Sequence, residues 1–386
     1  MDAGASHFDP LTLVDEWGPE KIVCVSHRRT GMRGVLVIDN TARGIGKGGT
    51  RMSPGITVAE VARLARNMTW KWAAVDMSFG GAKAGVRADP ACSDKEAILR
   101  AFARALHNEV PAHYVFGLDM GLTENDAAII VDELGREAAV GTPHALGGVP
   151  YDALGVTGYG VAEATAAAAD YMGLDLAAGA RVSIQGFGAV GSAAARRLAE
   201  LGAMVVAIST ARGVVHNADG LDLAEVFAAR EDAGDDLVSS VRGDRLTPGE
   251  ELSIDADIVV PAAMQDVIDR AMAGQVKAKL IVEGANLPTS VEAQQVLFER
   301  GVEVVPDFIA NAGGVIAAGL AMDARLSAFR LEPEPILRAV ADKLRANTGA
   351  CLRSAHRDDV PPHRAARALA SARVREAMIA RGQVPA

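Results

Sequence analysis

Three lysines stand close together in the sequence, at positions 47, 71 and 83, in a stretch rich in glycine and apolar residues. Lys71 directly follows a tryptophan, and Lys83 closes a Gly-Gly-Ala run shortly after Met77 and Phe79. A lysine in apolar surroundings holds its proton less tightly, so its neutral amine can act as a base near neutral pH. For any one of Lys47, Lys71 and Lys83 alone, an ordinary solvated position stays open. Together they indicate a site for proton transfer.

Asp119 is the acidic residue that could work with these lysines. Residues 110–121 predict a strand and a turn, and Asp119 lies at the end of that strand, between Leu118 and Met120. One interpretation is structural, because an aspartate in a turn often accepts hydrogen bonds from backbone amides. The other is chemical, since a carboxylate at this point could exchange protons with a substrate nitrogen.

A predicted helix carries the second lysine. Thr57 and Glu60 have the spacing of a capping box, so we expect the helix to begin there. An apolar stripe at helical spacing follows, made of Val58, Val61, Ala62, Ala65, Thr69 and Trp72. Lys71 lies on the flank of this stripe in the last turn, from where its side chain could reach a cleft. The residues between Lys71 and Lys83 suffice for a short strand and a glycine turn.

A second pattern, beginning after residue 180, predicts a dinucleotide site. A buried strand (181–185) is followed by a glycine motif, by a helix (192–201) and by another strand (204–208). The motif consists of Gly186, Phe187, Gly188, Ala189, Val190 and Gly191. In this pattern the first glycine permits a tight turn, the second a close approach of the pyrophosphate, and the third a close helix–strand contact. The helix N-terminus adds amides and a positive dipole for the phosphates.

The end of the second strand bears on which nicotinamide cofactor binds. An acidic residue is expected there to bind the ribose diol of NAD. The chain instead has Ser209, Thr210 and Arg212, with no acid among them. A 2′-phosphate would meet no repulsion, and Arg212 could pair with it. We therefore expect NADP at least as readily as NAD, although a plain turn arginine stays an alternative.

Further predicted strands end in small or amide residues. The strand at 257–260 leads to Ala262 and Ala263, the strand at 279–282 leads to Asn286, and the strand at 302–305 leads to Asn311. In an open parallel sheet, ligands bind outside the carboxyl ends of the strands. An asparagine there can donate to a carboxylate, or it can simply cap a helix or turn.

Five motifs, in order, resemble the glutamate/leucine/phenylalanine/valine dehydrogenase superfamily, and its glutamate branch most. They are KGGTR (47–51), MTWK (68–71), GGAKAG (80–85), EGAN (283–286) and NAGG (311–314). The resemblance covers nearly the whole chain and is weakest in residues 1–20 and 320–360. It implies an α/β protein with an N-terminal α/β substrate domain, a Rossmann-type doubly wound dinucleotide-binding domain and a cleft between them.

The resemblance also implies a reaction, the reversible oxidative deamination of an L-amino acid to a 2-oxo acid and ammonia with NAD or NADP. Lys71 and Asn286 would hold the α-carboxylate. Lys83 would activate water, and Asp119 would carry protons to and from the amino group. The nicotinamide would accept the hydride.

Substrate selectivity depends on two positions. In the glutamate enzymes a lysine and a serine receive the distal carboxylate, whereas branches acting on apolar amino acids have apolar residues at both. Lys47 matches the lysine, but the serine position is Ala318. Because a lysine facing an apolar substrate would be a buried unpaired charge, Lys47 favours glutamate. Ala318 indicates altered specificity, and a leucine-, valine- or phenylalanine-type dehydrogenase stays the alternative.

A different class of protein is also considered, a non-catalytic nucleotide-sensing paralogue that would keep the glycine motif and lose the chemistry. Lys71, Lys83, Asp119 and Asn286 are all present, which speaks against it.

Length and composition set the remaining expectations. A chain of 386 residues predicts two domains. We expect residues 1–150 to form a substrate-binding and oligomerisation domain, completed by C-terminal helices at 345–386, and residues 151–344 to form the NAD(P)-binding domain. The net charge of −10 argues against a nucleic-acid partner. Three scattered cysteines and no leader or long apolar run predict a cytoplasmic protein without metal or membrane partners. A homo-oligomer, a hexamer by analogy, is implied by the resemblance.

Overall fold

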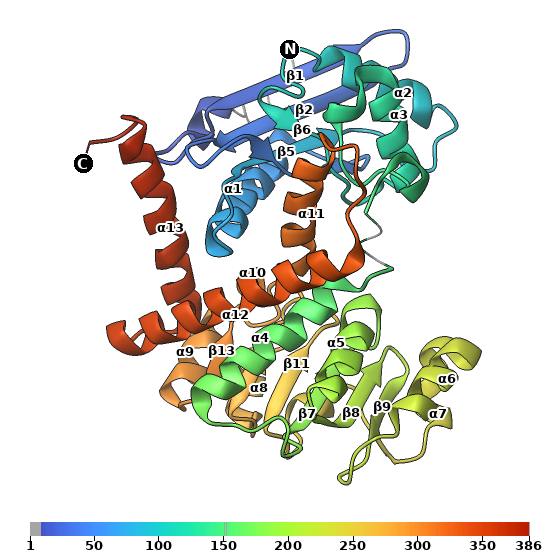
Figure 1. Ribbon diagram of the computed structural model, residues 1–386, viewed down its shortest axis with the longest axis vertical. Helices are drawn as coiled ribbons and strands as arrows, with labels where there is room; N and C mark the ends of the chain where they lie inside the picture. Colours follow the sequence, from blue (N-terminus) through green and yellow to red (C-terminus); the bar gives the residue numbers. More distant parts are fainter. Residues whose placement is uncertain (1–8, 150, 152, 386) are drawn as a thin grey trace, which may run out of the picture. The chain divides into compact units, whose positions relative to one another are not determined.

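The structure, a computed structural model, describes residues 9–149, 151 and 153–385, and the chain divides into two compact units. The first unit comprises Met1–Pro150, Ala318–Leu331 and Ser371–Ala386, and the second comprises Tyr151–Ala317 and Glu332–Ala370. Each is an α/β unit with its own sheet (Figure 1). The sequence assigned residues 151–344 to the second domain and residues 345–386 to the first, whereas residues 318–331 group with the first unit and residues 345–370 with the second. The functions assigned to the two predicted domains stay predictions.

The first unit contains a mixed sheet with helices packed on it. Its elements are η1 (Pro10–Leu13), β1 (Lys21–His27), β2 (Met32–Asn40), β3 (Gly46–Lys47), β4 (Thr50–Met52), α1 (Val58–Ala74), β5 (Gly80–Val86), α2 (Lys95–Ala105), β6 (Tyr114–Val115), α3 (Glu124–Leu134), η2 (Arg136–Ala138) and η3 (His144–Leu146). The strand order is β1-β2-β5-β3-β6, and β4 also pairs with β5. β2 is antiparallel to its two neighbours, while β3, β4 and β6 pair in parallel.

Strand β5 lies at the centre of this sheet and is buried along its whole length. The sequence predicted a glycine turn before Lys83, but the glycines form part of the strand. A Cβ on Gly81 would lie 2.0 Å from Thr69 Oγ1, and one on Gly80 would lie 2.5 Å from the Asn40 carbonyl oxygen. Glycine is therefore required here because helix α1 and strand β2 approach the backbone closely.

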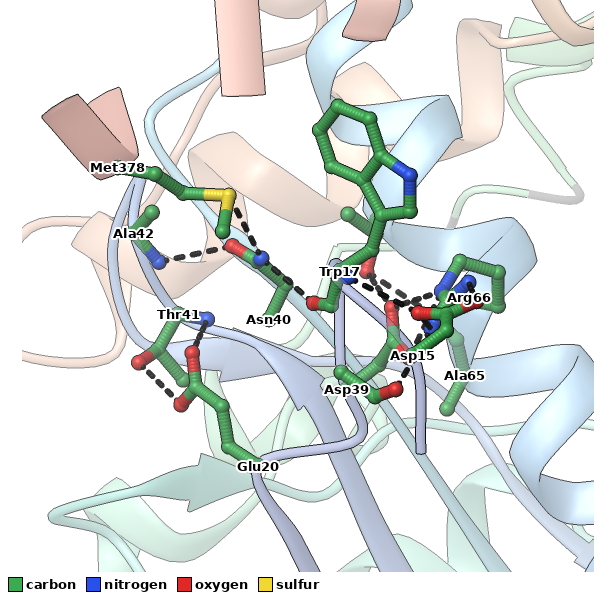
Figure 2. A network of polar contacts seen from close by, with 12 residues as sticks. Asp15, Trp17, Glu20, Asp39, Asn40, Thr41, Ala42, Ala65, Arg66 and Met378 are labelled. Carbon is green, nitrogen blue, oxygen red and sulfur yellow. Dashed lines mark hydrogen bonds and ion pairs between the residues drawn. The ribbon is translucent and has the colours of Figure 1, made fainter. Parts of the chain in front are cut away.

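A polar network holds helix α1 against strand β2 (Figure 2). Arg66, on α1, donates to both carboxylate oxygens of Asp39 at 2.9 and 2.8 Å, and its other nitrogens pair with Asp15. Thr69 adds a 2.6 Å hydrogen bond to the Asp39 carboxylate, which is 1% exposed. Nearby, the Asn40 side chain contacts the sulfur of Met378. This network fixes the helix whose last turn carries Lys71.

The second unit contains a seven-stranded sheet of the doubly wound type. Its elements are α4 (Val156–Met172), β7 (Arg181–Gln185), α5 (Ala189–Glu200), β8 (Met204–Thr210), β9 (Gly213–His216), α6 (Leu223–Ala233), η4 (Gly234–Asp236), α7 (Leu237–Ser240), β10 (Asp244–Leu246), η5 (Glu250–Leu252), β11 (Ile258–Pro261), α8 (Arg270–Gln275), β12 (Leu280–Val282), α9 (Val291–Glu299), β13 (Glu303–Val305), α10 (Asp307–Ala310) and α12 (Pro333–Asp358). Helices α11 (Gly313–Ala324) and α13 (Pro362–Ala380) each begin in this unit and end in the first.

The sheet order is β10-β9-β8-β7-β11-β12-β13. The five strands from β8 to β13 pair in parallel, and β9 and β10 extend the edge as an antiparallel pair. Helices α8 and α9 pack on one face in a buried cluster with β11, β12 and β13, and α4, α5 and α12 lie in front of the sheet in Figure 1. Parallel strands with crossover helices confirm the Rossmann-type fold predicted from the glycine motif.

The ends of several helices are defined by local features. Within residues 9–20 the only helical segment is the four-residue η1. A capping box at Thr123 begins α3, whereas α2 begins after Asp94 without a side-chain cap. Helix α4 begins at Val156, after the left-handed Gly155. Among the described residues, no helix has the length and apolar character needed to span a membrane.

Candidate active site

The centre of the candidate site is an ion pair between Lys83 and Asp119. Lys83 lies midway along β5 and is 6% exposed, and its Nζ is 2.8 Å from Asp119 Oδ2. Burial lowers the pKa of Lys83 below that of an ordinary lysine, although the carboxylate of Asp119 opposes the shift. Burial acts to raise the pKa of Asp119, but the charge and hydrogen bond of Lys83, together with the charge of Arg51, outweigh it and hold that pKa below its usual value. Proton transfer between the two groups needs no movement of the backbone.

A second cation shares the carboxylate. Arg51 Nε is 3.0 Å from the same Asp119 oxygen, and Arg51 also pairs with Glu60 at 3.0 Å, in the first turn of α1. Sequence reasoning gave Arg51 no role, although it is the last residue of KGGTR. Two cations on one carboxylate keep Asp119 ionised, as a proton acceptor requires.

Lys47 is a buried cation in strand β3. It is 2% exposed, and its Nζ donates to the carbonyl oxygens of Val115 and Phe116 at 3.2 and 2.9 Å. Burial, reinforced by the charges of Lys83 and Arg325, lowers the pKa of Lys47 to about 7. Among the described residues, no carboxylate lies within ion-pair distance of Lys47. A buried ammonium held only by neutral carbonyls is suited to receive an anion.

The other predicted substrate residues lie on helices. Lys71 is half-buried in the last turn of α1, and the indole of the adjacent Trp72 donates to the Lys47 carbonyl oxygen at 3.0 Å. Ala318 is half-buried on α11 and belongs to the first unit, as the three lysines do. Asn286 belongs to the second unit, so its joint action with Lys71 on a substrate stays a prediction.

The glycine motif has the local geometry of a phosphate-binding turn. Gly186 has φ +86°, which favours glycine, and a Cβ on Gly191 would lie 1.9 Å from the Gly186 carbonyl oxygen. A Cβ on Gly188 would meet no atom within 4 Å, which leaves the open approach that a pyrophosphate needs. Phe187 is buried, and Ala189 and Val190 begin helix α5, whose amides face this turn. These residues fit a dinucleotide.

A buried acid, Glu251, lies beside the end of strand β8, where the sequence predicted none. Ser209 Oγ accepts from the Gly186 amide at 3.0 Å and donates to Glu251 Oε1 at 3.1 Å, and Glu251 is 2% exposed. Thr210 donates to the Asp235 carbonyl oxygen at 2.7 Å. Arg212 Nε lies 3.5 Å from Asp236 Oδ1, with both side chains mostly exposed. The fold therefore brings a carboxylate to the arginine expected to bind a 2′-phosphate.

The turns after β12 and β13 are joined by their asparagines. Asn311 Nδ2 donates to Asn286 Oδ1 and to the Ala285 carbonyl oxygen, both at 3.1 Å. Glu283 directly follows β12, at the start of the turn that carries Asn286, and its carboxylate oxygens lie 3.0 Å from His363 Nε2. At the end of β11, the Ala262 amide donates to the Gln185 carbonyl oxygen at 2.8 Å, and Ala263 packs against Gly186. The predicted strand-end residues thus border one edge of the sheet.

Family models match both parts of the chain. The model described as "Glu/Leu/Phe/Val dehydrogenase, dimerisation domain" matches residues 19–136, and "Glutamate/Leucine/Phenylalanine/Valine dehydrogenase" matches residues 147–382. The chain belongs to the glutamate/leucine/phenylalanine/valine dehydrogenase family. It is therefore an NAD(P)-dependent amino-acid dehydrogenase, as the motifs predicted.

Individual members of this dehydrogenase family are similar over most of their length. The glutamate dehydrogenase of Thermotoga maritima is 35% identical over 91% of this chain and 87% of its own. The NADP-specific glutamate dehydrogenase of Saccharolobus shibatae is 34% identical over 94% and 90%. The crystal structure of the hetero-hexameric glutamate dehydrogenase of Thermus thermophilus, in a leucine-bound form, superposes with a TM-score of 0.80 at 34% identity, covering 98% of this chain and 93% of that one.

In this dehydrogenase, sequence reasoning missed three residues that shape the predicted site: Arg51, Glu251 and His363. Arg51 had a local signal, since it stands in the KGGTR motif beside Lys47. Glu251 had none, because only the fold brings it to Ser209, 42 residues earlier in the chain. His363 likewise reaches Glu283 across 80 residues.

Proposed function

We propose that this member of the family catalyses the reversible oxidative deamination of L-glutamate to 2-oxoglutarate and ammonia. The observation that carries the proposal is the buried Lys83–Asp119 pair, with its 2.8 Å contact, in the same unit as the buried cation Lys47. The pair can move protons at a reacting amino group, and the cation can receive a second carboxylate of the substrate.

The residues act in sequence on the bound amino acid. Asp119, ionised beside Lys83 and Arg51, accepts a proton from the substrate ammonium. The nicotinamide supplies the chemistry of accepting the hydride from Cα. Lys83, as the neutral amine that its lowered pKa makes accessible, takes a proton from the water that attacks the resulting iminium carbon. The carbinolamine then collapses: Asp119 returns its proton to the nitrogen as ammonia leaves, and the hydroxyl proton passes to solvent as the carbonyl of the 2-oxo acid forms.

Lys71 and Asn286 complete the substrate site in this proposal by holding the α-carboxylate, and they orient Cα toward the nicotinamide. The glycine motif and Asn311 hold the cofactor side. Either NAD or NADP serves this chemistry, and Arg212 supports NADP, whereas Asp236 opposes it by pairing with Arg212.

Glutamate is favoured over leucine, valine or phenylalanine by Lys47. An apolar substrate side chain would leave this buried ammonium without an anion, or force it to lose its proton. Ala318 supports the alternative, because no hydroxyl stands at the position where the glutamate enzymes have serine.

We also propose assembly into a homo-oligomer, with the hexamer as the analogous state. The support for assembly is the match of residues 19–136 to a domain described as a dimerisation domain, and the Thermus relative, which is hetero-hexameric, supports the number of subunits but not their identity. A cytoplasmic location stays the proposal made from the sequence.

A panel of 2-oxo acids with ammonia tests the proposal, with reduced NAD and reduced NADP followed separately. We expect the largest kcat/KM for 2-oxoglutarate. Turnover of 4-methyl-2-oxopentanoate or phenylpyruvate with none of 2-oxoglutarate would establish the apolar alternative instead. Cofactor binding without turnover of any 2-oxo acid would point to a nucleotide sensor.

A further inference from the structure

Lys47 has a cationic neighbour that no motif indicates. Arg325 directly follows helix α11 and continues its hydrogen bonding, because its amide donates to the Ala321 carbonyl oxygen at 3.0 Å. Its guanidinium is half-buried, with Nε donating to the Glu137 carbonyl oxygen at 3.1 Å and Nη1 donating to the Met322 carbonyl oxygen. Among the described residues, no carboxylate lies within ion-pair distance of Arg325. It is therefore a second partly desolvated cation whose hydrogen bonds go to neutral carbonyls, with the charges of Glu137 and Asp323 acting on it from beyond ion-pair distance.

The two cations lie on neighbouring backbone segments of the first unit. The Phe116 carbonyl oxygen accepts from Lys47 Nζ at 2.9 Å, and the Phe116 amide donates to the Ala138 carbonyl oxygen at 2.9 Å. Glu137, whose carbonyl oxygen accepts from Arg325, directly precedes Ala138. The backbone segments that hold the ammonium and the guanidinium are therefore hydrogen-bonded neighbours. The charge of Arg325 is one of the causes that lower the pKa of Lys47.

Arg325 also shares a helix face with the position where the serine is missing. Ala318 and Arg325 are seven residues apart, which is close to two helical turns. Side chains on a helix lean toward its N-terminus, so the guanidinium reaches back toward Ala318, in agreement with its contact to Met322. Ala321, Ala324 and Arg325 line a cavity of about 30 Å³ together with Arg136 and residues 139–142, whereas Lys47 and Ala318 are not among its lining residues. That volume suits two waters or a small polar group rather than a whole amino acid.

From this placement we infer that Arg325 determines substrate specificity, binding with Lys47 the distal carboxylate of an acidic substrate in place of the hydroxyl absent at Ala318. The inference rests on the proposed function and deepens it, because it explains how an enzyme without the serine still selects a dicarboxylic 2-oxo acid. A carboxylate supplies the anion that both cations lack, and a guanidinium offers it two parallel donors. An apolar side chain would leave both cations without an anion, which discriminates against it.

The test compares Arg325→Met with the parent enzyme, since methionine keeps much of the side-chain length and removes the charge. We expect the KM for 2-oxoglutarate to rise by about 10- to 100-fold, the loss typical of one charge-assisted hydrogen bond. We expect kcat to change by less than about threefold, and the KM for 4-methyl-2-oxopentanoate to stay equal or to fall. Arg325→Lys keeps the positive charge but lacks the two parallel N–H donors of the guanidinium, so it should recover part of the lost affinity.

Arg245→Met is the control. Arg245 belongs to the second unit and, like Arg325, donates to backbone carbonyl oxygens, those of Gly243, Ser239 and Val241, but it does not line the cavity beside Arg325. The control should leave the ratio of the two KM values unchanged. Equal losses toward acidic and apolar substrates in Arg325→Met would show that Arg325 only holds the backbone, and would overturn the inference.

Binding of glutarate, measured by calorimetry, separates this inference from the proposed reaction. Glutarate carries the distal carboxylate but has no reacting carbonyl. Binding to the parent that weakens at least tenfold in Arg325→Met supports the inference even if no 2-oxo acid is turned over. Equal binding to the parent and to a folded Arg325→Met protein overturns it, whatever the outcome of the turnover panel.

Discussion

The Nζ of Lys83 lies 2.8 Å from Oδ2 of Asp119, with the amine on the central strand of the first unit and the carboxylate in the turn after β6. Lys83 is the more buried partner, and Arg51 supplies Asp119 with a second positive neighbour. Burial makes the amine give up its proton more readily than an ordinary lysine, and the two cations hold the acid in its ionised form. This combination gives a base for water and an acceptor for an ammonium proton in one contact.

Replacing Lys83 by alanine should lower kcat by about 10²–10⁴-fold, the usual range for a lost general base. Asp119→Asn should have a comparable effect, because it keeps the shape and removes the proton acceptor. Steady-state kinetics of the deamination reaction check both. Lys21→Ala is the control, since Lys21 forms an exposed ion pair with Glu109 and should leave kcat unchanged. If the Lys83→Ala enzyme turned over substrate at nearly the parent rate, the proposed role of Lys83 as the general base would be wrong.

Lys47 should make the binding of a dicarboxylic substrate dependent on pH. Its pKa of about 7 in the free enzyme means that the ammonium form dominates below that pH. A bound carboxylate favours the charged form and raises the pKa, so above pH 7 binding takes up a proton and affinity falls by up to about tenfold per pH unit. The Kd of glutarate, measured across pH 6–9, should show this slope. Lys47→Arg should flatten it, because arginine keeps its charge throughout the range; a parent curve already flat would contradict the assignment.

Sequence reasoning reached the residues that stand in local motifs and missed those that the fold brings in. Lys83 and Gly186 were found because apolar neighbours and glycine spacing mark them within a few residues. No comparable local pattern surrounds Glu251 or Arg325 in the sequence. Each acts through a contact that only the tertiary structure creates. The same limit applies to β5, where the glycines were interpreted as a turn. The close approach of Thr69 that requires glycine there is invisible until α1 is packed.

Arg212 should control the choice between the two cofactors. Its alanine variant should lose affinity for NADP by about 10-fold or more while keeping that for NAD, because a phosphate contact of 1.5–3 kcal/mol is roughly that large. Asp236→Asn should act in the opposite direction, since it frees the guanidinium and removes a carboxylate near the phosphate. Fluorescence titration with reduced NAD and reduced NADP measures both. Equal loss of both cofactors in Arg212→Ala would identify a plain turn arginine.

Arg66 should be essential for stability because Asp39 is almost completely buried (Figure 2). Arg66→Met removes the cation from a carboxylate that cannot reach water, which should cost roughly 3–5 kcal/mol of unfolding free energy. Asp39→Asn in the same chain should recover much of that loss, since the buried charge is then gone as well. Thermal unfolding of the parent, the single variants and the double variant gives the coupling. Additive losses would mean that the two side chains do not act as a pair.

His363 should give the second unit a stability that depends on pH. Its ring is 12% exposed and its Nε2 lies 3.0 Å from both carboxylate oxygens of Glu283, at the base of the turn that carries Asn286. Burial acts to lower the pKa of His363, but the charge and hydrogen bond of Glu283, together with the charge of Asp307, outweigh it and raise the pKa above its ordinary value. A raised folded-state pKa means that the folded protein binds the proton more tightly than the unfolded chain. The stabilisation is therefore complete below about pH 6.5, the unfolded value, and is lost as the pH rises through the folded pKa.

The difference in melting temperature between the parent and His363→Gln should accordingly be largest near pH 6 and should shrink as the pH rises. At the acidic end we expect about 6–12 °C, because breaking a buried pair costs roughly 3 kcal/mol in a unit of this size. His356→Gln is the matched control: that ring is 63% exposed and lies 3.3 Å from Glu303, so its removal should matter far less. A His363→Gln deficit that stays constant with pH would show that the ring contributes by packing alone. Because the turn with Asn286 rests on Glu283, the same variant should raise the KM for the amino acid in parallel with its loss of stability, most strongly at low pH.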